Sequence, residues 1–198
     1  MEFVSAVRRV SEPKATLILM HGLGSDEQDM RGLADLLHPN LEVICLRAPH
    51  RYGPGFAWFD IQWTNQGIEI NEGQYWQSVE AVAQSMQGIS SDFLLVGGFS
   101  QGAMMSVGIL DKHAELVKGA VLLSGRGISG APCDFGGKVF QAHGAFDDVI
   151  PIDSAQTLRK RFSGLGDRYE FHQYEMGHSV CQEEIDDLNQ WLVGLLID

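Results

Sequence analysis

The segment FLLVGGFSQGAMMSVGILDK, residues 93–112, decides the fold class. It opens with an apolar run at 93–98, turns at Ser100 and continues at 101–112 as a helical segment. Within it, Gly98-Phe99-Ser100-Gln101-Gly102 fits the Gly-x-Ser-x-Gly pattern, in which a serine occupies a crowded turn between a strand and a helix. A Cβ atom on either flanking glycine would collide with neighbouring backbone there. The segment therefore predicts a strand, a nucleophile elbow at Ser100, and a helix whose N-terminal amides face a developing anion.

On both sides of this segment, short apolar runs alternate with helical segments. Most of the runs are continuously apolar, which is typical of strands covered on both faces of a parallel sheet. The predicted strands are 15–20, 41–46, 93–98, 120–123, 139–142 and 169–174, and the predicted helices are 26–37, 72–87, 101–112, 154–162 and 181–196. This alternation predicts an α/β fold with a mostly parallel central sheet and helices on both faces. Because no repeat or long linker interrupts it, residues 1–198 are expected to form a single domain.

Composition narrows the class of partner. The chain has 26 acidic and 14 basic residues, a net charge of −12, which argues against a nucleic-acid partner because such binding depends on clustered Lys and Arg.

No stretch approaches the roughly 20 apolar residues of a bilayer span, so no stable membrane insertion is expected. The N-terminal residues lack the apolar region of a secretion signal. Three widely spaced cysteines, Cys45, Cys133 and Cys181, indicate no disulfide framework and favour a cytoplasmic location. The oligomeric state is left open.

A serine hydroxyl needs a base to take its proton, and the base needs a carboxylate to fix its tautomer. His178 follows the predicted strand 169–174 on a glycine-containing loop, and Asp147 and Asp148 follow the strand 139–142. The order Ser, Asp, His, each at the carboxyl end of a successive strand, is the order of α/β-hydrolases. We therefore expect Ser100 and His178 to act with one of these two aspartates.

Two backbone amides are expected to bind the oxyanion. His21-Gly22-Leu23-Gly24 follows the strand 15–20, at the position where hydrolases provide one amide donor. The second donor is the residue after the nucleophile, so Leu23 and Gln101 are the candidates. An ordinary glycine-rich turn is the alternative interpretation of this loop. The histidines show no pair at metal-ligand spacing, so no metal site is expected.

Aromatic residues are concentrated at 52–63, YGPGFAWFDIQW. Gly53, Pro54 and Gly55 are expected to prevent a regular element from starting there, so the segment is interpreted as an aromatic loop. Such a loop could cap a pocket, or its rings could fold into a satellite core. The candidates for the acyl pocket are Phe56, Trp58, Phe59, Trp63, Met104 and Val180.

A different class of protein is suggested by Gly125-x-Gly127-x-x-Gly130, which formally matches the dinucleotide-binding fingerprint. That fingerprint requires a helix directly after it, whose N-terminus holds the pyrophosphate. Here the chain continues APCDFGG at 131–137, which cannot sustain a helix. A loop between strands is the better interpretation.

Six segments together carry a resemblance to a known family. They are LMHGLG at 19–24, RAP at 47–49, AWFD at 57–60, GFSQG at 98–102, HG at 143–144 with Asp147 and Pro151, and GH at 177–178. In this order they resemble the carboxylesterase/acyl-protein thioesterase (phospholipase/carboxylesterase) family of α/β-hydrolases. The resemblance implies a cofactor-free serine hydrolase in which Asp147, rather than Asp148, completes a triad with Ser100 and His178.

The resemblance also implies the substrate class. We expect a serine carboxylesterase that hydrolyses small-molecule short to medium acyl esters through an acyl-enzyme intermediate. An acyl-protein thioesterase or lysophospholipase is the first alternative. A catalytically silent hydrolase fold that binds ligands is the second alternative, because a fold alone does not establish activity.

Overall fold

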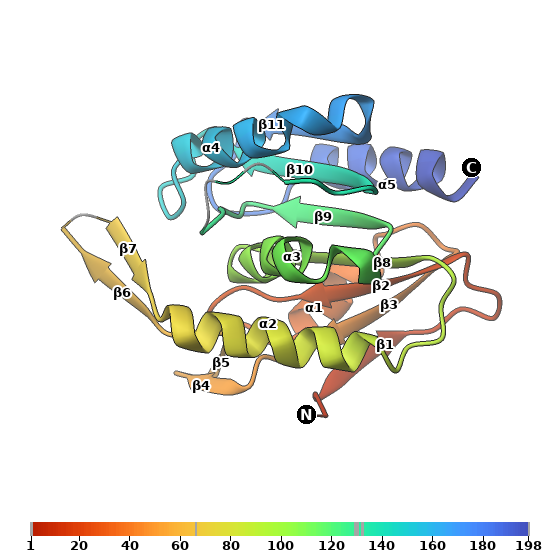
Figure 1. The fold of residues 1–198 in the computed structure, drawn as a ribbon, viewed down its shortest axis with the longest axis horizontal. Helices are drawn as coiled ribbons and strands as arrows, with labels where there is room; N and C mark the ends of the chain where they lie inside the picture. Colours follow the sequence, from red (N-terminus) through yellow and green to blue (C-terminus); the bar gives the residue numbers. More distant parts are fainter. Residues whose placement is uncertain (1, 66, 129–130, 132, 198) are drawn as a thin grey trace.

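The computed structural model describes residues 2–65, 67–128, 131 and 133–197. Its centre is a seven-stranded sheet in the order β1-β3-β2-β8-β9-β10-β11 (Figure 1). β1 pairs antiparallel with β3, and the other neighbours pair in parallel. The strands of this sheet are β1 (Ser5–Arg8), β2 (Ala15–Met20), β3 (Leu41–Leu46), β8 (Leu94–Phe99), β9 (Gly119–Leu123), β10 (Lys138–Gly144) and β11 (Tyr169–Tyr174). The prediction of an α/β fold with a mostly parallel sheet is confirmed.

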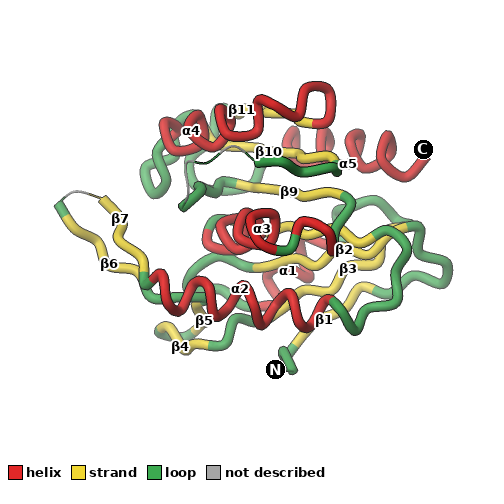
Figure 2. Tube along the Cα trace, in the orientation of Figure 1, coloured by secondary structure: helices red, strands yellow, loops and turns green. Residues whose placement is uncertain are grey.

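Helices cover both faces of the sheet, as Figure 2 shows. The α-helices are α1 (Glu27–Ala34), α2 (Glu72–Met86), α3 (Gln101–Lys112), α4 (Ile152–Phe162) and α5 (Gln182–Ile197), with 3₁₀ turns η1 (Ala114–Leu116) and η2 (Ser163–Arg168). One core lies under α2, α3 and α4 and includes Tyr75, Met104 and Phe162. The other lies under α1 and α5 and includes Met30 and Trp191. Burial on both faces explains the continuously apolar strands: every residue of β2 is buried.

The aromatic segment differs from its prediction as a loop. It contains the antiparallel pair β4 (His50–Tyr52) and β5 (Gly55–Ala57), followed by the hairpin β6 (Ile61–Thr64) and β7 (Gly67–Ile70), which projects from the body in Figure 1. Gly53 lies in the turn between β4 and β5 with φ 56°, a conformation that glycine adopts without strain. Gly53 and Pro54 therefore form the turn of a hairpin and Gly55 begins β5, so the expectation that these residues prevent a regular element from starting is wrong.

None of the helices that the structure describes is long and apolar enough to cross a membrane. The thiols of Cys45, Cys133 and Cys181 are unpaired. Gly130, the last glycine of the dinucleotide fingerprint, lies outside the described residues. In the described part of 124–137 no helix follows Gly125 and Gly127, so the feature that would hold a pyrophosphate is missing from that part.

Candidate active site

The turn at Ser100 joins β8 to α3 in a sterically crowded conformation. Ser100 has φ 55° and ψ −114°, in the region that non-glycine residues rarely adopt. A Cβ on Gly98 would lie 2.3 Å from the carbonyl carbon of Gly102, and a Cβ on Gly102 would lie 2.0 Å from the oxygen of Met20. Only glycine fits at both positions, because real Cβ atoms do not approach backbone that closely. The turn therefore presents the Ser100 side chain at the carboxyl edge of the sheet.

Three side chains from different strand ends meet at this edge. His178, in the loop between β11 and α5, places Nε2 2.8 Å from Ser100 Oγ. The other ring nitrogen, Nδ1, lies 2.7 Å from Asp147 Oδ2. Ser100 and Asp147 are buried, at 9% and 6% exposure, and the side chain of His178 is 15% exposed. The two distances form a continuous hydrogen-bond chain from the serine oxygen to the carboxylate.

The structure places Asp147, and not Asp148, beside His178. Asp147 Oδ1 accepts hydrogen bonds from the amides of Val149 and Ile150, at 2.9 Å and 2.8 Å, and these fix the carboxylate in the turn after β10. Asp148 is exposed. The two amide donors therefore fix the orientation of the Asp147 carboxyl group toward His178.

Buried His143 supports this carboxylate from the other side. Its Nε2 lies 2.7 Å from the Ile150 carbonyl oxygen and 3.4 Å from Asp147 Oδ2. Burial lowers the pKa of His143 below its ordinary value, which favours a neutral ring. A neutral Nε2–H donates to the carbonyl and adds no charge beside the carboxylate.

The loops that carry Asp147 and His178 are bonded to each other. The amide of Ala145 donates to Tyr174 O at 2.8 Å, and the amide of Phe146 donates to Met176 O at 3.0 Å. A Cβ on Gly144 would lie 2.3 Å from the Gly177 oxygen, so only glycine allows this approach. The His-Gly pair of the sequence therefore sets the spacing between the two loops.

The loop after β2 lies directly against Ser100. A Cβ on Gly22 would lie 3.3 Å from Ser100 Cβ, and both Gly22 and Leu23 line the same cleft as Ser100. Gly24, with φ +80°, turns the chain so that its amide donates to Phe56 O at 2.8 Å. Within the described part of the chain, the amides of Leu23 and Gln101 have no hydrogen-bond acceptor. Gln101 is also the first residue of α3, where amides have no acceptor within the helix.

A cleft of about 460 Å³ opens beside Ser100 and His178. Its size falls in the range of small-molecule sites. The apolar part of its wall comes from α1, from the end of β8 and from the loops after β2, β10 and β11. It consists of Leu23, Met30, Leu33, Phe99, Val149 and Val180. Asp26 caps α1 by accepting from the amide of Gln28 at 2.8 Å, which fixes the start of the helix that forms one wall.

The expected acyl pocket needs correction. Of its six candidates, Val180 lines the cleft, and Phe56, Trp58, Phe59, Trp63 and Met104 are not among the described residues of its wall. Trp58 and Phe59 are completely buried and Met104 is 4% exposed, all in the core under α2 and α3. Phe56 packs under the guanidinium groups of Arg47 and Arg51, and Trp63 is 59% exposed on the β6–β7 hairpin. Trp58 and Phe59 therefore neither cap the cleft nor form a separate satellite core, because they belong to the core under α2 and α3.

Gln101 explains why the aromatic segment lies beneath the turn. Its buried side chain accepts from the Trp58 amide and donates to the Phe59 carbonyl, both at 2.8 Å. The indole nitrogen of Trp58 donates to His21 O at 3.0 Å. These bonds use the polar groups of a buried segment and tie it to the loop beside Ser100. The segment therefore supports the turn at Ser100 from the core side and does not cap the cleft.

Met30 and Leu33 line the cleft although no sequence pattern predicted them as wall residues. Both belong to the apolar face of a helix whose other face is polar, and such a face normally packs entirely into the core. The signal available in the sequence was the position of this helix directly after the Gly22–Gly24 loop. Among the residues that the structure describes, no cluster of His, Cys, Asp or Glu is arranged to hold a metal ion.

The strand-serine-helix turn and the parallel sheet with helices on both faces define an α/β-hydrolase. The model of the phospholipase/carboxylesterase family matches residues 2–195. The chain belongs to this family, and the protein is a carboxylic-ester hydrolase.

Individual relatives agree with this assignment. The chain is 31% identical to "Acyl-protein thioesterase 1" of Mycosarcoma maydis over 218 residues, which cover 91% of each chain. The crystal structure of Zea mays acyl-protein thioesterase 2 is 25% identical, with a TM-score of 0.79 and coverage of 98% of this chain and 100% of that one. The crystal structure of esterase PE8 has the same fold, with a TM-score of 0.85 at 22% identity, covering 98% and 99%.

Proposed function

We propose that the protein is a serine carboxylesterase that hydrolyses short to medium acyl esters through a Ser100–His178–Asp147 triad. The observation that carries the proposal is the unbroken chain of 2.8 Å and 2.7 Å contacts from Ser100 Oγ through His178 to Asp147. The cleft of about 460 Å³ beside it gives an ester room to bind. Residues 1–198 act as one domain in this proposal, and the three unpaired thiols are in keeping with a cytoplasmic location.

The reaction proceeds in two stages. Ser100 Oγ attacks the acyl carbonyl while His178 Nε2 takes its proton, and Asp147 holds Nδ1–H and stabilises the imidazolium. The amides of Leu23 and Gln101 donate to the oxyanion of the tetrahedral intermediate. His178 returns the proton to the leaving alcohol, which leaves an acyl-Ser100 ester. Water, deprotonated by His178, then attacks this ester and releases the carboxylic acid and free Ser100.

The proposal is tested by labelling and substitution of Ser100. A fluorophosphonate should attach to Ser100, and Ser100→Ala should lower kcat by on the order of 10⁶ with an unchanged fold, because the nucleophile is removed. Ser179→Ala is the matched control, since Ser179 lines the same cleft but has no bond to His178 in the described structure. Intact-protein mass spectrometry without an adduct, together with full activity of Ser100→Ala, would overturn Ser100 as the nucleophile. No adduct together with no hydrolysis of any ester by the unchanged protein would favour the silent-fold alternative.

The cleft wall supports a limit on acyl-chain length. An acyl chain on Ser100 has Met30, Leu33 and Val180 to pack against, and each buried methylene contributes about 0.8 kcal/mol. Asp29 also lines the cleft, and its carboxylate accepts from Ser25 Oγ at 2.6 Å. A longer chain has to strip water from this carboxylate, which costs free energy.

We therefore expect kcat/KM for p-nitrophenyl esters to rise from acetate to about butyrate or hexanoate and to fall by dodecanoate. Asp29→Asn removes the charge with little change of shape, so it should move the maximum to longer chains. Asp153→Asn, on α4, is the matched control and should leave the maximum in place. A maximum at dodecanoate or beyond in the unchanged protein would contradict the limit set by Asp29.

Acyl-protein thioesterase activity is the second candidate, and the names of the relatives favour it. The same acyl chain presented as an oxygen ester and as a thioester separates the two functions. A higher kcat/KM for thioesters, with a continued rise to palmitoyl length, would replace the esterase proposal while leaving the triad in place. Lysophospholipids, assayed below their micelle-forming concentrations, test the remaining alternative.

A further inference from the structure

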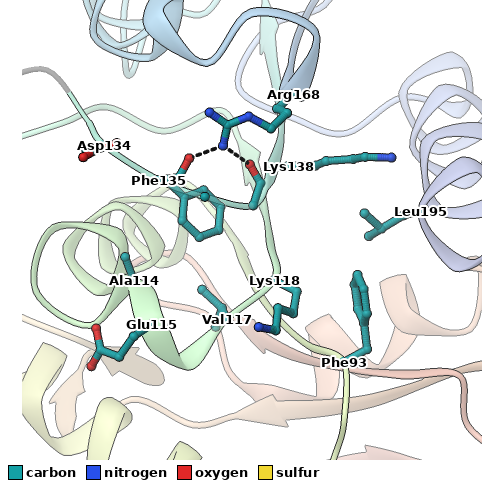
Figure 3. Close-up of a pocket in the computed structure, with 12 residues that line it drawn as sticks. Phe93, Ala114, Glu115, Val117, Lys118, Asp134, Phe135, Lys138, Arg168 and Leu195 are labelled. Carbon is teal, nitrogen blue, oxygen red and sulfur yellow. Dashed lines mark hydrogen bonds between the residues drawn. The ribbon is translucent and has the colours of Figure 1, made fainter. Parts of the chain in front are cut away.

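Figure 3 shows a second cavity. It lies at the amino ends of the parallel strands, at the edge of the sheet opposite to Ser100. Its volume is about 600 Å³, compared with about 460 Å³ for the cleft. Phe93, Lys118 and Gly137, which line it, directly precede β8, β9 and β10, whereas Ser100 follows the carboxyl end of β8. A strand of six residues at about 3.3 Å each spans about 20 Å. The two cavities are therefore separate sites.

The wall of this cavity is largely apolar. Phe93 and Leu195 lie on one side in Figure 3, and Phe135 lies across from them. Val117 adds a further apolar side chain between the two sides. Apolar surface that faces an open cavity remains in contact with water, and an alkyl group that fills the cavity removes it from water.

Charged side chains, with one more cation than carboxylate, line the cavity beside these apolar residues. Lys118, Lys138 and Arg168 line the cavity, against the two carboxylates of Glu115 and Asp134. This local excess contrasts with the net charge of −12 on the whole chain. The polar part of a ligand is therefore expected to be an anion.

Two of these cations have no carboxylate partner in the described structure. Lys118 is exposed and forms no ion pair among the residues that the structure places. The Arg168 guanidinium donates from Nη1 to the carbonyl oxygens of Phe135 and Gly137, which are neutral acceptors. A ligand carboxylate at this rim would gain charge-assisted hydrogen bonds without displacing a protein carboxylate from either cation.

Backbone contacts fix the positions of the segments that line the cavity. A Cβ on Gly137 would lie 2.2 Å from Lys118 O, so the two segments approach as closely as glycine allows. The Lys118 amide donates to Leu94 O at 2.8 Å, and the Lys138 amide donates to Lys118 O at 3.2 Å. A preformed site binds with little cost in ordering.

We propose that this cavity binds a medium-chain aliphatic carboxylate. The alkyl chain lies between Phe93, Phe135 and Leu195, and the carboxylate lies at the rim near Lys118 and Arg168. This assignment does not depend on the hydrolase reaction, because no residue of the cavity belongs to the Ser100 site.

Amide-resolved NMR titration of the full chain with decanoate tests the proposal. The amides of 117–119 and 136–138 should shift and saturate, whether or not the protein shows esterase activity. Decanol, which has the same alkyl chain without the charge, should bind about tenfold more weakly, as expected for the loss of a charge-assisted hydrogen bond. Decyltrimethylammonium, with the opposite charge, should not shift these amides.

Two variants locate the ligand. Lys118→Glu should weaken decanoate binding about tenfold, whereas Lys160→Glu, an equal change of charge at an exposed position of α4, should leave it unchanged. Ala114→Trp fills the cavity and should abolish the shifts. If Ala114→Trp fails to fold, the decanoate affinity of Lys118→Glu still tests whether the ligand lies in this cavity. Shifts confined to the cleft amides near Gly22 and Val180, equal affinity for decanol and decanoate, or an unchanged affinity in Lys118→Glu would each overturn the proposal.

Discussion

Asp147 and Asp148 are neighbours in the chain, but their surroundings are different. Asp147 is buried between two backbone amides and His178, while Asp148 is exposed. Asp147→Asn should lower kcat by on the order of 10⁴, because an amide that donates to Nδ1 favours the wrong histidine tautomer. Asp148→Asn is the matched control and should change kcat less than about threefold. Steady-state kinetics that show the larger loss of kcat for Asp148→Asn would contradict the assignment of Asp147 as the carboxylate that serves His178.

At the residue scale, the sequence predicts the groups whose chemistry depends on a local pattern. Ser100 is recognisable because Gly98 and Gly102 are required by backbone contacts within a few residues of it. The wall of the cleft is different: Met30 and Val180 are far apart in sequence and meet only through the packing of α1 against the sheet. The concentration of aromatic residues at 52–63 led to a wrong prediction of the acyl pocket, because large aromatic rings bury as much surface in a core as in a pocket.

At the element scale, Gly144 joins the two loops that carry Asp147 and His178. A Cβ at this position would lie 2.3 Å from the Gly177 oxygen and 2.4 Å from the Met176 oxygen, so Gly144→Ala should push the His178 loop away from Ser100. A displacement of about 1 Å is expected to cost roughly 10² in kcat.

The matched control for this substitution is Gly194→Ala, at an exposed position of α5 where an added Cβ meets nothing within 4 Å. It should leave kcat unchanged and stabilise the helix by about 1 kcal/mol. Kinetics and thermal unfolding of both variants separate the two effects. Full activity of Gly144→Ala would show that the loop spacing does not control the triad.

Regular elements were predictable where one pattern persists over a whole strand or helix. The strands 15–20, 41–46 and 169–174 and the helix 101–112 have the predicted bounds. β1 was missed because it is short and its four residues are exposed or half-buried, as befits an antiparallel edge. The β6–β7 hairpin was missed because each strand is only four residues long, although Ile61, Trp63, Ile68 and Ile70 alternate with other residues and pair across the hairpin.

At the scale of the whole molecule, folding buries an ionisable group that the proposed reaction does not use. Glu184 is completely buried at the start of α5, and this burial raises the pKa of its carboxyl from 4.5 to about 8, offset in part by the Cys181 amide. Below pH 4.5 the carboxyl is protonated in both the folded and the unfolded protein. Between pH 4.5 and 8 the unfolded protein loses this proton and the folded protein keeps it.

The free energy of unfolding should therefore fall between pH 4.5 and 8 because of Glu184, by up to about 1.4 kcal/mol per pH unit. Glu184→Gln removes the titration with little change in side-chain volume. The stability difference between Glu184→Gln and the unchanged protein should be small at pH 4.5 and should grow in favour of the variant up to pH 8. Glu183→Gln, one residue away and exposed, is the matched control and should show no such trend. Urea unfolding at several pH values measures the difference, and a constant difference across this range would show that Glu184 is not held protonated by the fold.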